Sequence, residues 1–345
     1  MAVTEDLILN FTPQDLDRII EEAEEDLVLQ KIKSPEAFLH EILQERVAAA
    51  TSMPWENTHG QFDLRAGEFT LWAGESGSGK SMILGQVISH VIAQGYKAVI
   101  ASMEMKPHQT LRRMLGQCAG VPIENIGETF VSNWLKWATG KLWLYDKLDT
   151  VASDLILRLI KAVSYKLSVQ HIVIDSLVKC GLPQDGGNWL SKQTDFCDQL
   201  QHLAKHLDIH IHLVCHLRKP DSRSHNRATK YDIRGASQIS DLADNVILLS
   251  RNRTKEEVLA KREDDRDEDD LEALDEPDVY MEIAKQRHHP VERVFGLDYL
   301  RDSNQFVTPG RKNPMTWPRG SAILPWAIQQ SETEQRDNFF EDFDE

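Results

Sequence analysis

The sequence of 345 residues predicts an α/β domain with a twisted, mainly parallel sheet, preceded by a short α-helical N-terminal segment. Two observations carry this prediction. From about residue 61 to 328, short continuous apolar runs alternate with helical stretches, which is typical of a parallel sheet covered on both faces. Before residue 61, two stretches carry apolar residues at helical spacing, and each opens with a Ser or Thr followed by Pro.

The N-terminal segment is expected to contain two amphipathic helices, over 13–31 and 35–50, because proline fits the first position of each. The stretch 51–60 contains proline, asparagine and glycine, which indicates a linker. We therefore expect three parts: a helical segment and linker helix at 1–52, a main domain at 53–328, and an acidic, aromatic tail at 329–345. The composition of the tail predicts disorder.

The main domain is expected to hold six strands, at residues 69–73, 98–101, 142–145, 172–174, 209–214 and 246–249. A helix follows the first of them over 82–93, where apolar residues recur at helical spacing. In open sheets of this kind, ligands bind at the carboxyl ends of the strands. The residues that follow each strand are therefore the candidates for function.

Charge is distributed unevenly along the chain. The net charge of −16 argues against nucleic acid, but much of the acid lies in 256–278 and in 331–345. Between Arg218 and Arg234 the balance reverses, which is the local basic surface that phosphate contact needs. The net charge of the whole chain does not reveal this local basic loop. The net charge therefore does not exclude a nucleic-acid partner.

Location is constrained by what the chain lacks. No apolar run approaches the ~20 residues that cross a membrane, and the start resembles neither a signal peptide nor a transit peptide. The four cysteines are scattered without a CxxC pair, which argues against a zinc ribbon or a disulfide framework. We expect Cys215, in an apolar run, to be a buried small hydrophobe. The expected location is cytoplasmic, with no membrane partner.

Residues 74–81 form a complete phosphate-binding pattern between a predicted strand and a predicted helix. Glycines let backbone N–H groups turn inward, and the helix that follows points its positive end at a phosphate. Lys80 can then reach the β- and γ-phosphates, and the Ser81 hydroxyl can bind Mg²⁺. The predicted nucleotide-binding residues are Gly74, Glu75, Ser76, Gly77, Ser78, Gly79, Lys80 and Ser81.

Four other strand ends carry polar residues suited to hydrolysis. Glu104 is the candidate base for an attacking water, and Asp175 is the candidate partner of Mg²⁺. His216 is placed to sense the γ-phosphate and to pass its state to the basic loop that follows. The fourth strand leads into Arg251. We expect Glu104 and His216 each to lie one strand along from the phosphate loop.

The ordered motifs GESGSGKS, ASMEM, HIVIDSL, VCHLRKPD, DIRGASQISDLADNVILLSRN and IAKQR resemble the helicase domain of ring-shaped replicative helicases. The resemblance covers about 55–310. It is strongest to the helicase half of phage primase-helicases and to the mitochondrial helicase Twinkle, and weaker to bacterial DnaB. It implies a RecA-like P-loop ATPase fold and hydrolysis of ATP, or dTTP, with Mg²⁺. It also implies 5′ to 3′ movement on single-stranded DNA and a homo-hexamer.

The resemblance assigns roles residue by residue. Lys80, Ser81, Glu104, Asp175 and His216 fall on the phosphate-loop, base, metal and sensor positions. Lys285 and Arg287 match the basic pair offered to the neighbouring subunit, and Arg251 and Tyr299 match the pair that sandwiches the nucleotide base. The residues that match the DNA-binding loop are Arg218, Lys219, Arg223, Arg227, Lys230 and Arg234. Arg287 is the implied arginine finger, and strand alternation predicts that it shares a face with Lys285.

The chain departs from the family in three places. His288-His289-Pro290 stands where the family often has glycine. The acidic insert 254–278 has no counterpart, and we expect a solvated loop there. With so few cysteines, we expect a helicase without its own zinc-dependent primase half. A separate primase, polymerase or single-strand-binding protein is therefore the expected partner, with the tail as a docking peptide or merely a solubilising segment. A bacterial virus, and thus a bacterial cytoplasm, is the expected setting.

Two other functions share this core. A strand-exchange or repair ATPase of the recombinase type forms filaments and need not unwind DNA. A regulatory or loader protein would bind ATP with no response to DNA. The basic pair and the basic loop favour the helicase over both.

Overall fold

The computed structural model describes residues 35–38, 50–183, 186, 188–217, 229–233, 237–288 and 292–317. Pro35–Phe38 form a short 3-10 helix. A compact unit that begins at Ala50 contains the other elements. Most of the predicted N-terminal helices, the tail and five residues of the predicted DNA loop lie outside these ranges. The five are Arg218, Lys219, Arg223, Arg227 and Arg234.

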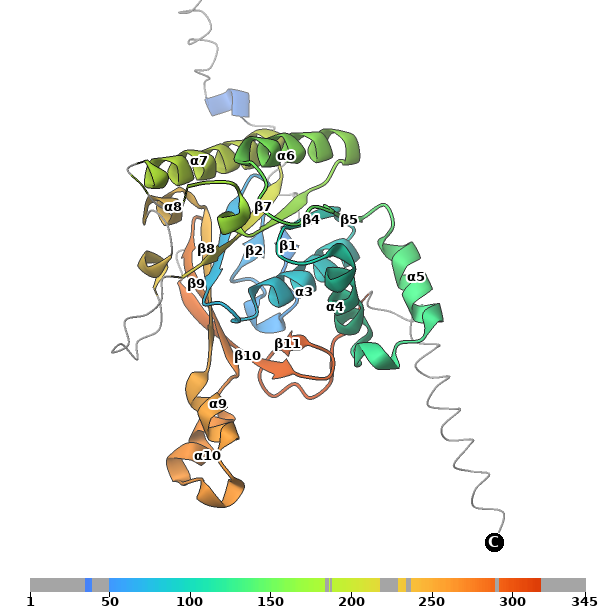
Figure 1. Cartoon of the computed structure of the whole chain (residues 1–345), viewed down its shortest axis with the longest axis vertical. Helices are drawn as coiled ribbons and strands as arrows, with labels where there is room; N and C mark the ends of the chain where they lie inside the picture. The colour runs from blue at the N-terminus through green and yellow to red at the C-terminus, as the bar shows by residue number, and fades with distance from the viewer. Residues whose placement is uncertain are drawn as a thin grey trace, which may run out of the picture. The chain divides into compact units, whose positions relative to one another are not determined.

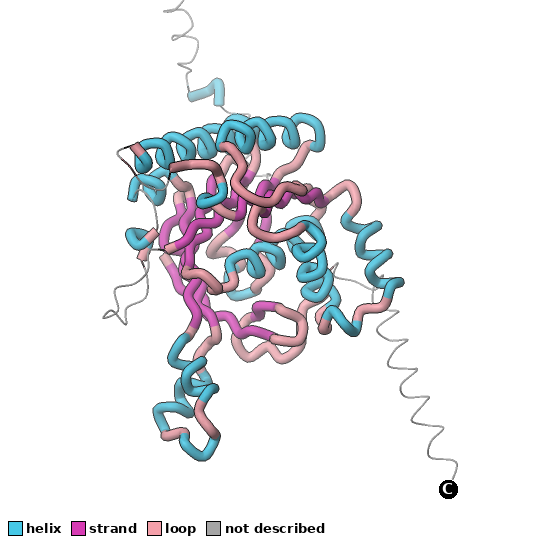
Figure 2. The backbone as a smooth tube through the Cα atoms, viewed as in Figure 1, coloured by secondary structure: helices cyan, strands magenta, loops and turns pink. Residues whose placement is uncertain are grey.

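A nine-stranded sheet forms the centre of this unit (Figure 2). Its order is β11(Gln305–Val307), β10(Arg293–Leu300), β9(Val279–Gln286), β8(Asn245–Arg251), β3(Phe69–Gly74), β7(His210–His216), β6(His171–Asp175), β4(Ala98–Ser102) and β5(Leu142–Leu144). The strands from β8 to β5 are parallel, and β9, β10 and β11 add an antiparallel extension. The predicted α/β fold with a mainly parallel sheet is confirmed, as are the six predicted strands.

Helices cover both faces of the sheet (Figure 1). One hydrophobic core includes residues of α3(Lys80–Ala93), α4(Pro107–Ala119) and α5(Glu128–Ala138). The other includes residues of α6(Ser153–Leu167), α7(Trp189–Leu207) and α8(Ser237–Leu242). Alternation along β3 sends Trp72 into the first core and Leu71 and Ala73 into the second. Because both faces are buried, the strand reads as a continuous apolar run. No helix in the described ranges has the length and apolar character needed to cross a membrane.

The expected linker at 51–60 is wrong. Thr51–Ser52 form β1, which pairs antiparallel with β2(Asp63–Leu64). Met53 and Trp55 between them are fully buried, and the Trp55 indole donates to the backbone oxygen of Phe306 at 2.7 Å. The turn-forming residues here belong to a segment that packs against the domain. Burial of the two large side chains stabilises this packing more than the local sequence favours an exposed linker.

The expected solvated loop at 254–278 is also wrong. The chain forms α9(Arg253–Ala260) and α10(Glu268–Asp275), which extend from the ends of β8 and β9 (Figure 1). Asn252 caps α9 by accepting from the Lys255 backbone N–H at 3.1 Å. Both carboxylate oxygens of Asp270 bind Lys261 at 2.7 Å, which joins the two helices. Caps and ion pairs of this kind let a strongly acidic segment form helices.

Three histidines are buried together near the amino-terminal ends of β6 and β7. Trp72 donates its indole N–H to His212 Nδ1 at 3.1 Å, which leaves the proton of His212 on Nε2, 3.2 Å from His171 Nδ1. His210 Nδ1 lies 2.6 Å from the carbonyl oxygen of Arg65 and therefore carries the proton. Burial lowers the pKa of His210 to about 4, and those of His171 and His212 well below the usual value. The cluster is neutral at physiological pH.

Candidate nucleotide-hydrolysis site

The phosphate loop joins β3 to α3 and requires glycine at two points. Gly79 caps α3 in the left-handed region, with φ of 88°, and an added Cβ would lie 2.9 Å from the Phe306 ring. A Cβ on Gly74 would lie 2.5 Å from Ser78 Oγ and 2.6 Å from the Leu249 carbonyl oxygen. Close packing against β8 and β11 therefore fixes the loop around a space next to its glycines.

Lys80 is folded back onto this loop. Its Nζ donates to the carbonyl oxygens of Gly74 at 2.8 Å and Glu75 at 2.7 Å. The residue is only 5% exposed. Burial lowers the pKa of Lys80, an effect that nearby Asp175 and Glu104 oppose. A buried ammonium whose partners are neutral carbonyls can exchange them for the more favourable oxygens of a phosphate.

Ser81 and Asp175 form the arrangement that suits a hydrated magnesium ion. The Ser81 hydroxyl donates to Asp175 Oδ2 at 2.6 Å. Burial raises the pKa of Asp175, and the Ser81 hydrogen bond partly offsets this. Mg²⁺ prefers oxygen ligands and keeps several of its waters, so one hydroxyl and one carboxylate beside a phosphate loop fit it. The donor set of these residues is compatible with the predicted ion.

Glu104 contacts two other residues of the site. Ser176 Oγ donates to Glu104 Oε1 at 2.5 Å, and His216 Nε2 lies 3.7 Å from the same oxygen. The nearby His216 imidazole lowers the pKa of Glu104 to about 2, with a further contribution from the Ser176 hydrogen bond and against the effect of burial. The carboxylate is therefore ionised at physiological pH, and it can orient a water molecule as well as accept its proton.

The expected spacing of these residues from the phosphate loop is only partly correct. β7 is the direct neighbour of β3, and Gly74 and His216 are register partners. Asp175, on β6, is one strand further, and Glu104 follows β4, three strands from β3. Glu104 reaches the site because its side chain turns toward Ser176 and His216. Strand order, which sequence does not give, decides these separations.

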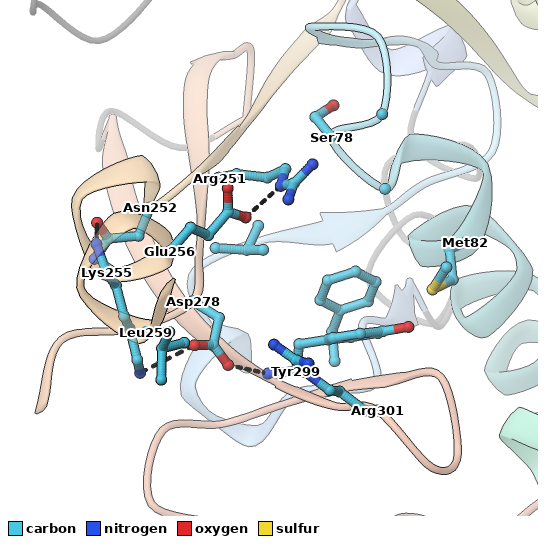
Figure 3. Close-up of a pocket in the computed structure, with 14 residues that line it drawn as sticks. Ser78, Met82, Arg251, Asn252, Lys255, Glu256, Leu259, Asp278, Tyr299 and Arg301 are labelled. Carbon is cyan, nitrogen blue, oxygen red and sulfur yellow. Dashed lines mark hydrogen bonds and ion pairs between the residues drawn. The ribbon is translucent and has the colours of Figure 1, made fainter. Parts of the chain in front are cut away.

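A pocket of about 910 Å³ opens beside the phosphate loop (Figure 3). Gly77, Ser78 and Gly79 line one side of it. Both predicted base-contacting residues, Arg251 and Tyr299, also line it. Arg251 Nε is paired with Glu256 Oε1 at 2.5 Å, and the Tyr299 ring lies 5.1 Å from that of Phe306. The volume is in the range of small-molecule sites.

Helix α9 supplies a wall of this pocket that the sequence did not predict. Lys255, Glu256 and Leu259 line the cavity (Figure 3). Lys255 Nζ binds Asp278 Oδ1 at 3.0 Å and the carbonyl oxygen of Glu276 at 2.5 Å, which fixes the helix against the start of β9. Because the insert is acidic, its sequence did not indicate that it lines a nucleotide pocket. The only sequence feature that pointed to the pocket was its closeness to Arg251.

Lys285 and Arg287 lie at the opposite edge of the sheet. Asn245, the first residue of β8, is the register partner of Gln286. A register shift leaves Ala284 unpaired before Lys285, and β9 ends at Gln286, so Arg287 lies just beyond the strand. Both side chains contact α8 or the residues that follow it. Lys285 Nζ binds the carbonyl oxygens of Ser240 at 2.9 Å and Asp241 at 2.7 Å; Arg287 binds Asp244.

Lys230 is the one predicted DNA-contacting residue that the structure describes. Its Nζ lies 3.3 Å from the carbonyl oxygen of Ala284 and 3.1 Å from Glu292 Oε1. A bridge between Leu217 and Ile233 closes the base of the basic loop. Its two ends are thus held together, with Lys230 attached to β9.

Comparison with known proteins gives one consistent result. The model of the DnaB-like helicase C terminal domain matches residues 58–308. The Twinkle homolog protein, chloroplastic/mitochondrial, of Arabidopsis thaliana is 23% identical over 218 residues, which are 59% of this chain and 30% of that protein. The chain thus spans less than a third of that relative. These matches agree with the resemblance seen in the motifs.

Two solved structures are similar to this one. "The Structure Of A DnaB-Like Replicative Helicase And Its Interactions With Primase" has a TM-score of 0.63 at 16% identity, covering 84% of this chain and 72% of that one. The second, described as an ATPase domain, has a TM-score of 0.64 at 15% identity, covering 80% of this chain and 99% of that one. At such identities the likeness establishes the fold.

Proposed function

The chain belongs to the family of the DnaB-like helicase C-terminal domain, and we propose that it is a replicative DNA helicase. It hydrolyses ATP, or dTTP, with Mg²⁺ and moves 5′ to 3′ along single-stranded DNA, separating the strands of a duplex. The single observation that carries the proposal is the assembly of Lys80, Ser81, Asp175, Glu104 and His216 at one edge of the sheet.

Within one subunit, each residue has a distinct task. Lys80 exchanges the carbonyl oxygens of its own loop for β- and γ-phosphate oxygens. Ser81 and Asp175 would hold a magnesium ion, which would supply positive charge beside the phosphates. Glu104, held by Ser176 and His216, orients the attacking water in line with the γ-phosphate. Arg251 and Tyr299 contact the base in the adjoining pocket.

The neighbouring subunit completes the site. Phe69 and Gly74 stand at the two ends of β3, about 17 Å apart at the usual rise of a strand. Lys285 and Arg287 lie near the Phe69 end, so they cannot reach the phosphates bound at Gly74 of their own chain. In a closed ring, head-to-tail contacts bring this edge of one subunit to the nucleotide of the next. Arg287 then acts as the arginine finger, and the assembly is a homo-hexamer.

DNA is held by the basic loop that follows His216. Arg218, Lys219, Arg223, Arg227 and Arg234 contact the backbone of a single strand in the central channel. His216 touches Glu104 and precedes the loop directly, so loss of the γ-phosphate alters both together. Lys230 has a second task, since it joins the loop to β9. A separate primase, polymerase or single-strand-binding protein acts with the ring in a bacterial cytoplasm.

Forked DNA provides the decisive experiment. Hydrolysis and strand separation are measured with forks that carry only a 5′ tail or only a 3′ tail, and the assembly is sized in the presence of nucleotide. Unwinding that requires the 5′ tail is the expected result. The triple variant K219A/R223A/R227A should retain nucleotide binding and lose stimulation by DNA.

The rival functions give different results in the same assay. Filaments, with DNA-stimulated hydrolysis but no unwinding of either fork, would indicate a recombinase. Hydrolysis that ignores DNA would indicate a loader or regulator.

A further inference from the structure

The Arg287 side chain is held by a single buried carboxylate. Arg287 Nε lies 2.8 Å from Asp244 Oδ1. The Asp244 side chain is 3% exposed, whereas that of Arg287 is 48% exposed. Among the residues the structure describes, Asp244 is the only hydrogen-bond or ion-pair partner of Arg287. One end of the guanidinium is therefore anchored, and the rest faces outward.

Asp244 is itself fixed by the sheet. Its Oδ2 accepts from the Phe69 backbone N–H at 2.9 Å, and its own N–H donates to the Phe69 carbonyl oxygen at 2.8 Å. Gln201 Nε2 lies 3.4 Å from Oδ1. Phe69 begins β3, the strand that ends in the phosphate loop. The carboxylate thus has a defined position relative to the sheet.

The way Arg287 is bound determines what it can still bind. A guanidinium offers five N–H groups in a planar fork, and Nε carries only one of them. Contact through Nε leaves the two terminal nitrogens available for two parallel hydrogen bonds to a phosphate. Contact through those terminal nitrogens would have consumed the same donors. The observed geometry therefore anchors the side chain without blocking it.

We propose that Asp244 is the positioning residue of the arginine finger. It holds Arg287 through Nε, so that the terminal nitrogens face the γ-phosphate bound by the neighbouring subunit. This inference rests on the proposed function, because it requires Arg287 to act on a neighbour. Asp244 is buried beside Phe69, at the end of β3 away from the phosphate loop, and it acts only through Arg287.

The substitution D244N separates this role from a structural one. An asparagine keeps the size of the side chain and one oxygen that can accept from the Phe69 N–H. Its amide then presents N–H groups to Arg287 Nε, where two donors face each other. The finger is released while the hydrogen bond to β3 is kept. D195N, at an exposed aspartate on α7, is the matched control.

Turnover and nucleotide affinity are the first readouts. D244N should lower kcat by roughly 100-fold, the scale of a small misplacement of a catalytic group. Affinity for a fluorescent nucleotide should stay within about twofold, because the nucleotide contacts are far from Asp244. The double variant D244N/R287A should be no slower than R287A, since Asp244 acts through Arg287. Additive losses, or a D244N enzyme as fast as D195N, would overturn the inference.

Mixed rings distinguish this inference from the proposed function. E104Q lacks the base but offers an intact finger to its neighbour. An equal mixture of E104Q and D244N should form complete sites at about a quarter of its interfaces, and its turnover should exceed that of either variant alone. Recovery with R287A plus E104Q, but not with D244N plus E104Q, would reject Asp244 while keeping the finger. Recovery in neither mixture would reject the action between subunits and the inference with it.

A second variant guards against a folding defect. D244S keeps a small polar side chain but shortens it and offers nothing charged to Arg287. Both variants should form rings and melt cooperatively. Loss of kcat in both, with rings and nucleotide affinity retained, is the expected result.

Discussion

Gly74 and His216 face each other in the register of two adjacent parallel strands, so the phosphate loop begins beside the residue that ends β7. His216 Nε2 also lies 3.7 Å from Glu104 Oε1. One side chain therefore has a fixed relation to the phosphate loop and contacts the carboxylate that we propose orients the attacking water. The basic loop starts at the next residues of the chain.

Replacing His216 should uncouple DNA from hydrolysis. H216A removes the contact to Glu104 but leaves Lys80, Ser81 and the glycines in place, so nucleotide affinity should be retained. We expect kcat with single-stranded DNA to fall by roughly 10²-fold, the usual effect of losing a positioned catalytic group. Hydrolysis with and without DNA measures this. H202Q, at an exposed histidine of α7, is the control. Full stimulation by DNA in H216A would show that the sensor lies elsewhere.

Gly79 should not tolerate a side chain. In G79A the Cβ would enter the Phe306 ring, and alanine would have to adopt a φ of 88°. We expect nucleotide binding to weaken by at least about 10-fold, because strain of about 1–3 kcal/mol would displace the loop. Calorimetric titration with a non-hydrolysable nucleotide measures the loss. G127A is the control, since its Cβ would meet nothing within 4 Å and its φ is −71°. Equal affinity in both variants would contradict the packing argument.

Helix α9 should contribute to nucleotide affinity. K255A removes the bonds that fix α9 to Asp278 and to the Glu276 carbonyl oxygen, so this wall of the pocket loses its support. We expect KM for nucleotide to rise about 3- to 10-fold with little change in kcat, because the wall contacts ground state and transition state alike. K261A breaks the ion pair between α9 and α10, outside the pocket, and should leave KM unchanged. A normal KM in K255A would remove α9 from the site.

The buried histidine cluster should make the fold sensitive to mild acid. His171, His210 and His212 have lowered pKa values in the folded chain, whereas unfolded histidines titrate near pH ~6.5. Below that pH the unfolded state binds more protons, so the free energy of unfolding decreases as pH falls. Each histidine contributes at most about 1.4 kcal/mol per pH unit. For His210 the loss extends down to about pH 4.

Urea denaturation at pH 7.5, 6.5 and 5.5 measures this slope. Glu68 Oε2 lies 4.0 Å from His210 Nδ1, and burial raises the pKa of Glu68, which acts against the slope because a folded state that holds a proton gains stability in acid. H212Q should flatten the pH dependence, and the exposed-site variant H202Q should not. The same slope in wild type and H212Q would exclude the cluster as its cause.

Sequence was sufficient for the elements that obey simple periodicity. β3, β4 and β6 read as apolar runs because both their faces are buried, and residues 74–81 fix the loop between strand and helix. The order of strands was beyond reach, since it depends on long-range pairing. Glu104 shows the effect: its strand is three positions from β3, and only its side-chain direction brings it to His216.

Composition misled in two segments where packing decides the structure. Met53 and Trp55 lie in a stretch rich in turn formers and are nevertheless fully buried. Lys255 lies in an acidic insert, yet it helps to line the pocket. Asp244 lies within one of the ordered motifs but was assigned no role from sequence, and its contact with Arg287 joins residues 43 positions apart. Such contacts follow from the three-dimensional fold and not from local pattern.

Strand β9 joins two regions that, in the proposed ring, would serve different nucleotides. Its first residue, Val279, lines the pocket of its own chain, and its other end carries Lys285 and leads to Arg287. A strand of eight residues, hydrogen-bonded on both sides, is stiff along its length and spans about 24 Å. In the proposed ring, a shift imposed by nucleotide at one end would therefore be delivered to the next subunit as a displacement at the other. Around a ring, the β9 strands would make hydrolysis in each subunit depend on hydrolysis in the subunit before it. Hydrolysis would then proceed from subunit to subunit in one rotational direction.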